Sequence, residues 1–481
     1  MIDAKKELER GLWWLGSATL LMRVVDVAAT LVVLQLIGAE QVGLASIPFS
    51  VLTVLESLTG LGVGQAMVQG PHLSRRETDG LFWFATGFGA AMAAALCMAA
   101  PIIAGVYGDA RLTPLLLVSS TKLVFVALAL IPAQLLVREL KFAQSSATQT
   151  VASVLESVMK IVLAVMGAGA WALILSGVAR GLFLLIALYA VAPYWPRMQF
   201  AWAEVKRFVS FGARVVSSAT LFHFYRNADY LLIGRVLGME VLGVYRVAFD
   251  IALGPQEVLF NVVNRVSYPV YARLAADTQA LIAAFFRSAR YFLVAMGPVA
   301  VVVFFLAPVV VPLLAHGRWA PAVPLIQILV GAGLTRGLAL LFPQVFHARG
   351  KPQLAIYDSI ITMVMLVSGF LLALTAFEAG AAGVAWTWVL TYPLVIVSQL
   401  VLVQRAVEIA PLAYLRSLAG PVLGIAIMAA ATFTLTRVPL LPGLWGPTLA
   451  AVISLGGYLA YVRFALPGVS RAAITQGVDA A

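Results

Sequence analysis

The segment from Tyr225 to Pro269 is long and apolar enough for two membrane-spanning helices, yet it carries seven charged residues. These residues are Arg226, Asp229, Arg235, Arg246, Asp250, Glu257 and Arg265. An ionised side chain at the centre of a bilayer costs roughly 2.5–3.5 kcal/mol on insertion scales, whereas each Leu, Ile, Phe or Val returns only about 0.3–0.6 kcal/mol. We therefore expect these helices to line a polar interior rather than to face lipid.

The second half of this segment places its polar residues at a spacing typical of one helical face. Arg246, Asp250, Gly254, Glu257, Asn261 and Asn264 follow one another at intervals of three and four, and Arg265 comes directly after Asn264. Such intervals align side chains along one side of a helix. Arginine suits a phosphate-bearing substrate because its planar fork binds two oxygens at once. The carboxylates would position the arginines or exchange protons. A structural polar seam, satisfied by neighbouring helices, is the alternative.

In two places nearer the N-terminus, a basic residue lies three positions before a carboxylate. His223, Arg226 and Asp229 lie in the first half of the same segment, and Arg23 and Asp26 lie in the first predicted helix. A local ion pair that lowers the cost of insertion would explain each pair equally well. The sharper hypothesis is a cationic substrate site to which both helices contribute.

Other charges in apolar stretches have less obvious roles. Arg336 follows two nearby glycines and is a further candidate for the substrate cavity. Glu156 and Lys160 are four residues apart, so they are expected to neutralise one another within one helix. Four more charges look like isolated polar points: Glu56, Lys122, Arg180 and Asp358.

The composition places these residues in an integral membrane protein. Hydrophobic residues make up 62% of the 481 residues and charged residues only 11%, whereas soluble domains are about a quarter charged. The net charge of +11 is dispersed over short loops, so a positive-inside bias explains it better than a nucleic-acid partner. The single cysteine, Cys97, excludes an internal disulfide or a thiolate metal site.

Hydropathy predicts an all-α polytopic fold with about fourteen transmembrane helices. The predicted helices span approximately residues 11–37, 42–68, 81–106, 114–137, 147–168, 171–195, 209–237, 241–268, 284–315, 322–347, 354–376, 381–403, 418–436 and 445–465. Lys and Arg concentrate in alternate loops, which predicts that both termini are cytoplasmic and agrees with an even number of spans. The first stretch is too long for a cleaved signal peptide and is expected to remain as a span.

The chain also repeats short stretches of its sequence after about two hundred residues. The run Ile37–Gly43 (IGAEQVG) matches Leu237–Gly243 (LGMEVLG), and Ser17–Leu20 matches Ser218–Leu221. Six spans per repeat give both halves the same orientation, with substrate bound between them. The predicted parts are residues 1–200, 201–410 and 411–481, the last holding two extra helices and a cytoplasmic tail. The segment Tyr194–Phe211 is expected to join the halves as an interfacial amphipathic linker.

Motifs of soluble enzymes are missing from the sequence. It contains no P-loop, no GxSxG and no HExxH. We therefore expect a transport protein rather than an enzyme, without a bound cofactor, driven by a proton or sodium gradient or by consumption of its substrate elsewhere.

Three stretches resemble bacterial polysaccharide transporters of the Wzx type, which are lipid-linked oligosaccharide flippases of the multidrug/oligosaccharidyl-lipid/polysaccharide exporter superfamily. They are LIGAEQVGLASI near the start, YRNADYLLIGRVLGMEVLGVYRVAF, and Gly317–Gln327. The resemblance implies two six-helix bundles in a V-shaped arrangement, two extra helices and alternating access across the bacterial inner membrane. It further implies a substrate built on undecaprenyl diphosphate, used for O-antigen, capsule or exopolysaccharide synthesis. Membrane lipids, a polysaccharide polymerase and a chain-length regulator are the implied partners.

Two other functions remain open at this point. An ion-coupled multidrug exporter would share the architecture, but a cavity for cationic drugs should be net acidic, and this one leans basic. A membrane enzyme, such as a polymerase or ligase of lipid-linked glycans, would handle the same substrates. Such enzymes usually need a sizeable external loop, and the loops predicted here are short.

Overall fold

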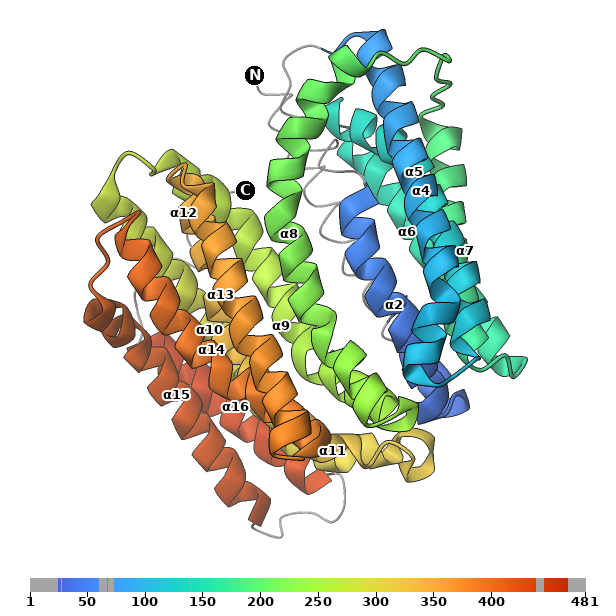
Figure 1. Cartoon of the computed structure of the whole chain (residues 1–481). Coiled ribbons are helices and arrows are strands. Elements are labelled where there is room, and N and C mark those ends of the chain that lie inside the picture. The colour runs from blue at the N-terminus through green and yellow to red at the C-terminus, as the bar shows by residue number, and fades with distance from the viewer. Residues whose placement is uncertain are drawn as a thin grey trace. The chain divides into compact units, whose positions relative to one another are not determined.

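The computed structural model in Figure 1 describes residues 25–26, 28–59, 67, 73–139, 141–437 and 445–465. Over these residues the protein is helical, without β-strands. Eleven of the described helices are long and apolar enough to cross a membrane. Helices α8 and α9, each of 35 residues, are also long enough to cross a membrane, but they carry more charged residues. The protein is therefore an all-α, multi-pass membrane protein, while the total of fourteen spans stays a prediction.

The chain divides into two compact units, Met1–Gly243 and Val244–Ala481. The helices of the first unit are α2 (Ala39–Thr59), α4 (Arg75–Tyr107), α5 (Leu112–Arg138), α6 (Phe142–Val165), α7 (Ala170–Val191) and α8 (Trp202–Val236). Helix α5 packs against α4 and α7, and α8 lies along α2 (Figure 1). The repeat boundary near residue 200 concerns sequence similarity rather than packing, and it too stays a prediction.

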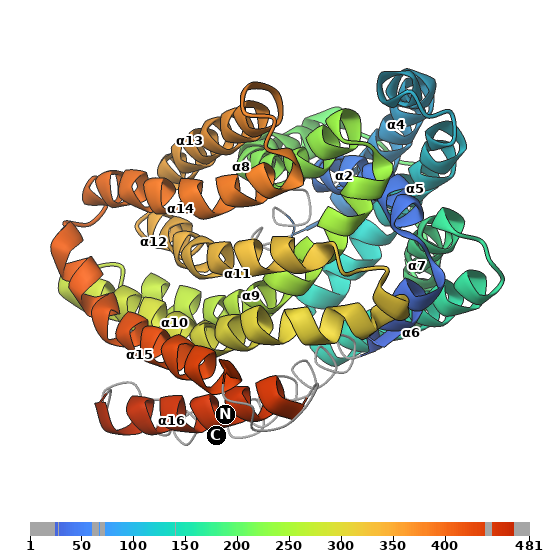
Figure 2. The same ribbon diagram turned by 90° about the horizontal axis from the view of Figure 1, so that it is seen from below.

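The second unit is built around α11, whose hydrophobic span is 67% buried, against 22% for α16. Its helices are α9 (Met239–Arg273, which begins in the first unit), α10 (Thr278–Val310), α11 (Ala322–Ala339), α12 (Phe342–Ala348), α13 (Pro352–Leu371), α14 (Gly380–Gln404), α15 (Pro411–Arg437) and α16 (Trp445–Ala465). Figure 2 shows α11 between α10 and α14, both of which it contacts. The last two helices, α15 and α16, pack against each other and against α10.

Local sequence sets where several helices begin and end. Ser74 and Glu77 form a capping box at the start of α4, and Gly108 ends that helix in the left-handed conformation with φ of 67°. At the start of α10, the Asp277 side chain accepts a hydrogen bond from the backbone N–H of Ala280 at 3.0 Å. Both helices start about six residues before their predicted apolar spans. Hydropathy does not detect their first turns, because these contain charged and polar residues.

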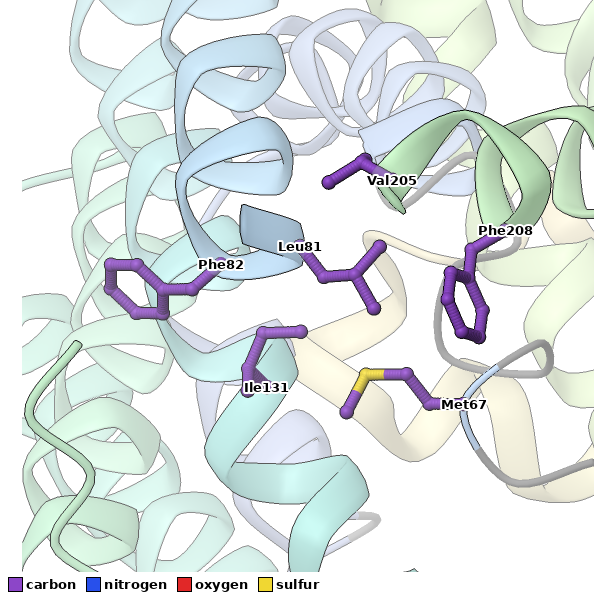
Figure 3. Close-up of a cluster of buried hydrophobic side chains, with 6 residues drawn as sticks. All are labelled: Met67, Leu81, Phe82, Ile131, Val205 and Phe208. Carbon is purple, nitrogen blue, oxygen red and sulfur yellow. The ribbon is translucent and has the colours of Figure 1, made fainter. Parts of the chain in front are cut away.

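The linker predicted as an interfacial helix has a different structure. Residues 192–201 are not helical, and α8 begins at Trp202 and runs without interruption to Val236. Figure 3 shows why the prediction was wrong: Val205 and Phe208 on the first turns of α8 are buried with Leu81 on α4 and with residues of α5. The start of α8 is thus held by the core of the first unit.

The segment before α8 is fixed by polar contacts as well. The Tyr194 hydroxyl donates to Asp79 on α4 at 2.5 Å, and Trp83 donates from Nε1 to the carbonyl of Arg197 at 2.9 Å. Burial, reinforced by the bond to Asp79, raises the pKa of Tyr194 above its usual value.

Two repeat-related glycines meet within the first unit. A Cβ atom added to Gly43 on α2 would collide with the carbonyl oxygen of Met239, and one added to Gly243 on α9 would collide with the carbonyl oxygen of Ala39. The two contacts are equivalent under a shift of 200 residues, the same shift that relates IGAEQVG to LGMEVLG. Only glycine permits so close a backbone approach at both positions.

Candidate substrate site

Helix α8 holds the first set of predicted site residues at different depths within the first unit. Asp229 is fully buried, with 0% exposure, and its Oδ1 accepts the backbone N–H of Tyr230 at 2.8 Å. His223 and Arg226 are half-buried, and the Arg226 guanidinium lies 5.9 Å from the Phe222 ring centre. Arg226 and His223 therefore remain accessible in part, whereas Asp229 supports the helix from inside.

Helix α9 carries the second set along its length. Arg246 donates from Nε to Asp250 at 2.9 Å, one turn further along the same helix. Asp250, Asn261 and Arg265 are exposed, and Glu257 is half-buried. Because α9 is a continuous helix from Met239 to Arg273, their spacing places these residues on one face, as predicted.

Arg336 differs from the other predicted arginines because it is almost completely enclosed. Its side chain on α11 is 1% exposed, with Nη1 3.0 Å from Oε1 of Gln256 and Nη2 3.6 Å from Oε1 of Glu257. Its guanidinium carbon also lies 5.7 Å from the Trp388 ring centre. In this conformation Arg336 joins α11 to α9 and positions Glu257 rather than presenting a charge to a ligand.

An aromatic group closes this part of the second unit. Trp388 on α14 donates from Nε1 to the Tyr245 hydroxyl of α9 at 2.9 Å, and it stacks on Tyr392 with ring centres 5.8 Å apart. Phe249 meets the Trp388 ring edge-on at 5.5 Å. Water is thus excluded from one side of Arg336, which strengthens its polar contacts.

The first unit pairs its charges between helices. Lys160 on α6 lies 3.3 Å from Asp26, and Arg180 on α7 lies 3.5 Å from Glu156 on α6. The expectation that Glu156 and Lys160 neutralise one another is therefore wrong, because each has a partner on another helix. Arg23, the predicted companion of Asp26, lies outside the described residues.

All four of the supposed isolated charges likewise have partners. Lys122 on α5 contacts Glu56 on α2 at 2.8 Å, and Arg180 is the partner of Glu156. Asp358 on α13 accepts a hydrogen bond from Gln399 on α14 at 3.1 Å. Spacing along one helix cannot reveal such pairs, since they depend on which helices become neighbours.

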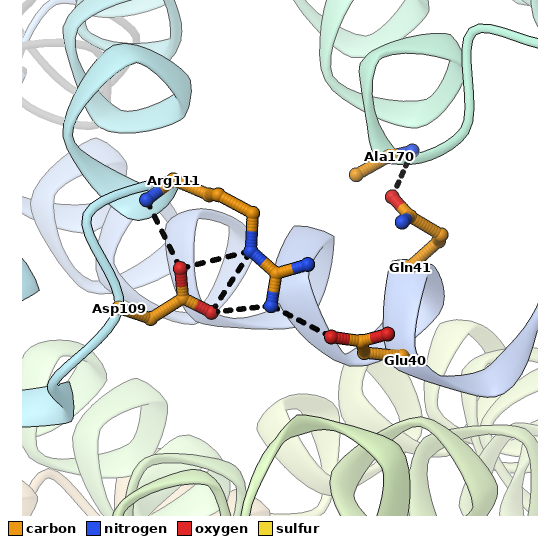
Figure 4. A network of polar contacts seen from close by, with 5 residues as sticks. All are labelled: Glu40, Gln41, Asp109, Arg111 and Ala170. Atoms are coloured by element: carbon orange, nitrogen blue, oxygen red, sulfur yellow. Dashed lines mark hydrogen bonds and ion pairs between the residues drawn. The ribbon is translucent and has the colours of Figure 1, made fainter.

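A polar network at the start of α2 connects three parts of the first unit (Figure 4). Arg111 forms ion pairs with Asp109 at 2.7 Å and Glu40 at 2.6 Å, and Gln41 accepts the backbone N–H of Ala170 at 3.0 Å. The hydrogen bonds from Arg111 hold the pKa of Asp109 below its usual value, against the opposing effect of burial. The arrangement fastens helix ends and leaves the Arg111 side chain about half exposed.

Within the described part of the chain, no three His, Cys, Asp or Glu residues gather in a way that could hold a metal ion. Helix α8 in the first unit and helix α9, most of which lies in the second, each carry arginines and carboxylates. These residue types suit an anionic ligand and proton exchange.

Comparison with known proteins identifies the family. The sequence profile of the polysaccharide biosynthesis protein family matches residues 32–324, which is more than half of the chain. The chain belongs to this family.

Three bacterial proteins are similar to the chain over most of its length. The lipopolysaccharide biosynthesis protein WzxC of Escherichia coli is 22% identical over 78% of this chain and 76% of its own length. The teichuronic acid biosynthesis protein TuaB of Bacillus subtilis is 23% identical, with 81% and 80% covered. The succinoglycan biosynthesis transport protein ExoT of Rhizobium meliloti is 24% identical, with 63% and 61% covered.

Solved structures establish the fold of this family member. The lipid II flippase MurJ in an inward closed conformation superposes with a TM-score of 0.76 at 12% identity, covering 93% of this chain and 97% of that one. An inward-facing multidrug resistance transporter of the MATE family superposes with a TM-score of 0.63 at 16% identity, covering 79% and 94%. These two superpositions show the fold, and the family match over residues 32–324 confirms the resemblance to bacterial polysaccharide transporters that the sequence predicts.

Two polar residues of the site escaped prediction or received no role. Gln256 precedes Glu257, is 0% exposed and accepts a hydrogen bond from Arg336 at 3.0 Å, but a single glutamine beside a charged stripe attracts no notice. Gln399 donates to Asp358 and lies in the run Leu394–Val403, whose other residues are apolar except for Ser398. A lone amide in such a run is the available indication, because burying it without a partner is costly.

Proposed function

We propose that the chain is a flippase that moves an oligosaccharide linked to undecaprenyl diphosphate from the cytoplasmic to the periplasmic leaflet of the bacterial inner membrane. Its glycan would serve O-antigen, capsule or exopolysaccharide synthesis. Membership of the polysaccharide biosynthesis family, in a chain with the fold of a lipid II flippase, carries the proposal. The same observation supports a transporter rather than an enzyme.

The polar faces of α8 and α9 suit this substrate. A diphosphate bears closely spaced negative oxygens, and Arg246 and Arg265 offer guanidinium groups on one helical face. Within the first unit, Arg226 offers a guanidinium group of the same kind. Asp250 and Glu257 would keep the arginines oriented while the sugars form hydrogen bonds with groups such as Asn261. Both termini would lie in the cytoplasm, and a polymerase and chain-length regulator would act on the delivered product.

Deletion of the gene in its native host tests the assignment. We expect the lipid-linked glycan to accumulate in the inner leaflet, surface polysaccharide to disappear, and a plasmid copy to restore it. Normal surface polysaccharide without accumulation of the lipid-linked precursor would contradict the proposal.

The arginines are tested by Arg246→Ala and Arg265→Ala, with Arg463→Ala at the exposed end of α16 as the matched control. A hydrogen bond to a charged group contributes about 1.5–3 kcal/mol, so each site variant should lower glycan export by roughly ten- to a hundredfold. The control should export normally at equal protein level. Unchanged export in both site variants would remove the cationic-site hypothesis.

A multidrug exporter is the second candidate, favoured by the superposition on the MATE transporter. It predicts that the deletion strain becomes sensitive to cationic drugs while its surface polysaccharide remains intact. The flippase proposal predicts the reverse, so one strain separates the two functions.

A further inference from the structure

A carboxyl–amide pair lies buried in the second unit, apart from the arginines of α8 and α9. Asp358, near the start of α13, is 5% exposed, and Gln399, near the end of α14, is 2% exposed. Gln399 donates from Nε2 to Oδ2 of Asp358 and to the carbonyl oxygen of Ala339, both at 3.1 Å. One amide group thus joins the ends of three helices around a single carboxyl.

Two buried oxygen atoms of this pair lack a hydrogen-bond donor. They are Oδ1 of Asp358 and Oε1 of Gln399. An ionised carboxylate can only accept hydrogen bonds, and a buried acceptor without a partner costs about 1–3 kcal/mol or more. If the oxygen and nitrogen of the Gln399 amide exchanged places, Oε1 would face Oδ2 of Asp358 and the carbonyl oxygen of Ala339. All three atoms are acceptors, so no hydrogen bond could form between them. Either orientation of Gln399 therefore leaves buried acceptor atoms without a donor.

Among the described residues, no cation forms an ion pair with this carboxyl, and burial and Gln399 are the influences that act on Asp358. The other charged groups on the helices packed around it have other partners or are exposed: Arg336 bonds to α9, His347 on α12 is exposed, and Arg349 and Lys351 donate to backbone carbonyls. An ionised Asp358 would be a buried charge without a counter-ion, which is strongly unfavourable inside a membrane.

We propose that Asp358 binds a proton within the membrane and that Gln399 is its hydrogen-bond partner. The proton forms a bond with Oδ1, neutralises the carboxyl and supplies the donor that the pair lacks, while the bond from Nε2 to Oδ2 is retained. A metal ion fits less well, because hard cations take six or more oxygen ligands and this pair offers two. Resting on the proposed function, we further infer that release and uptake of this proton accompany each transport cycle.

Infrared spectroscopy of the full-length protein in lipid nanodiscs tests the proton site without any substrate. Wild type and the control Glu408→Gln, altered at an exposed loop carboxylate, should show the C=O absorption of a protonated carboxylic acid at pH 7. Asp358→Asn, which keeps the shape and supplies a neutral donor, should lose this band completely. An identical band in Asp358→Asn, or no such band in wild type, would overturn the proposal.

Two further measurements keep the inference testable. If Asp358→Asn does not fold, Gln399→Leu serves instead: it should shift the band by removing the hydrogen-bond partner, and an unshifted band would refute the assigned pairing. Added sodium should leave the wild-type band unchanged, and its disappearance would show a metal-ion site instead.

Coupling to transport is tested separately. Glycan export by wild type should depend on the proton gradient, and export by Asp358→Asn should lose that dependence. Retained dependence in the variant would overturn the coupling role. The infrared result stands or falls independently of whether the transported molecule is a lipid-linked glycan, so failure of one proposal does not conceal failure of the other.

Discussion

At the scale of single residues, the charges in the first unit stabilise contacts between helices. The Lys160–Asp26, Lys122–Glu56 and Arg180–Glu156 pairs each join side chains from different elements. Charged side chains are expensive in a membrane unless they are paired or hydrated, so each pair restricts which helices can be neighbours. These pairs give the unit specific packing in an environment where apolar contacts alone discriminate poorly.

The Glu56–Lys122 pair allows this role to be measured. Its nitrogen and oxygen are 2.8 Å apart, although the contact lacks hydrogen-bond alignment, and both side chains are only partly exposed. Glu56→Ala and Lys122→Ala should each destabilise the protein by about 1–3 kcal/mol. The double variant should lose less than the sum, with a coupling of about 0.5–2 kcal/mol. Thermal unfolding in detergent gives these values, and strict additivity would contradict the pairing.

Arg336 should be more sensitive to substitution than the exposed arginines. Arg336→Ala leaves Gln256 and the half-buried Glu257 without their shared cation, and breaking a buried pair on one side costs about 3–5 kcal/mol. The predicted result is low protein yield and early unfolding. Combining Arg336→Met with Glu257→Gln removes both charges and should recover much of that stability. Equal losses in the single and double variants would show that packing, not the ion pair, is what Arg336 contributes.

At the scale of helices, hydropathy predicted the order of the described elements well, but it did not predict how far the helices continue beyond their apolar stretches. The predicted span 209–237 is the later part of α8, which starts at Trp202. Its first turns look interfacial because aromatic and basic residues alternate there, yet Val205 and Phe208 are buried against α4 and α5. Whether such a face meets lipid or protein depends on tertiary packing, which one sequence does not contain.

The site residues show the same division. The stripe on α9 follows from spacing, and its arrangement on one face was predictable. The partners of Arg336 and Asp358 were not predictable. Gln256 lies 80 positions from Arg336, and Gln399 lies 41 positions from Asp358. The depth of Asp229 also depends on neighbouring helices rather than on its own.

The meeting of α2 and α9 at Gly43 and Gly243 leads to a prediction at this scale. Gly43→Ala inserts a methyl group where the carbonyl oxygen of Met239 lies, so the helices must separate. Overpacking typically costs about 1–3 kcal/mol. Gly38→Ala is the matched control, since nothing lies within 4 Å of its added Cβ. Thermal unfolding should distinguish the two, and Gly243→Ala should reproduce the effect of Gly43→Ala if the repeat-related contacts are equivalent.

At the scale of the whole molecule, the positive-inside rule and the order of the helices lead to the same topology. Helices α13 and α14 run in succession, with Arg349 and Lys351 before α13, Glu378 between the two helices, and Arg405 after α14. Basic residues thus lie at one end of this pair and an acidic residue at the other. The cytoplasmic side is therefore expected at Lys351 and Arg405.

Two substitutions one helix apart test this topology. In a chain freed of thiols by Cys97→Ala, Glu378→Cys and Glu408→Cys each place one thiol in an exposed position on either side of α14. An impermeant maleimide added to spheroplasts should label Glu378→Cys at once and label Glu408→Cys only after the membrane is opened. The reverse pattern would show that the predicted orientation of the whole chain is inverted, because successive helices cross the membrane in alternating directions. Labelling of both from outside would mean that α14 does not cross the membrane, which would also undermine a buried proton site between Asp358 and Gln399.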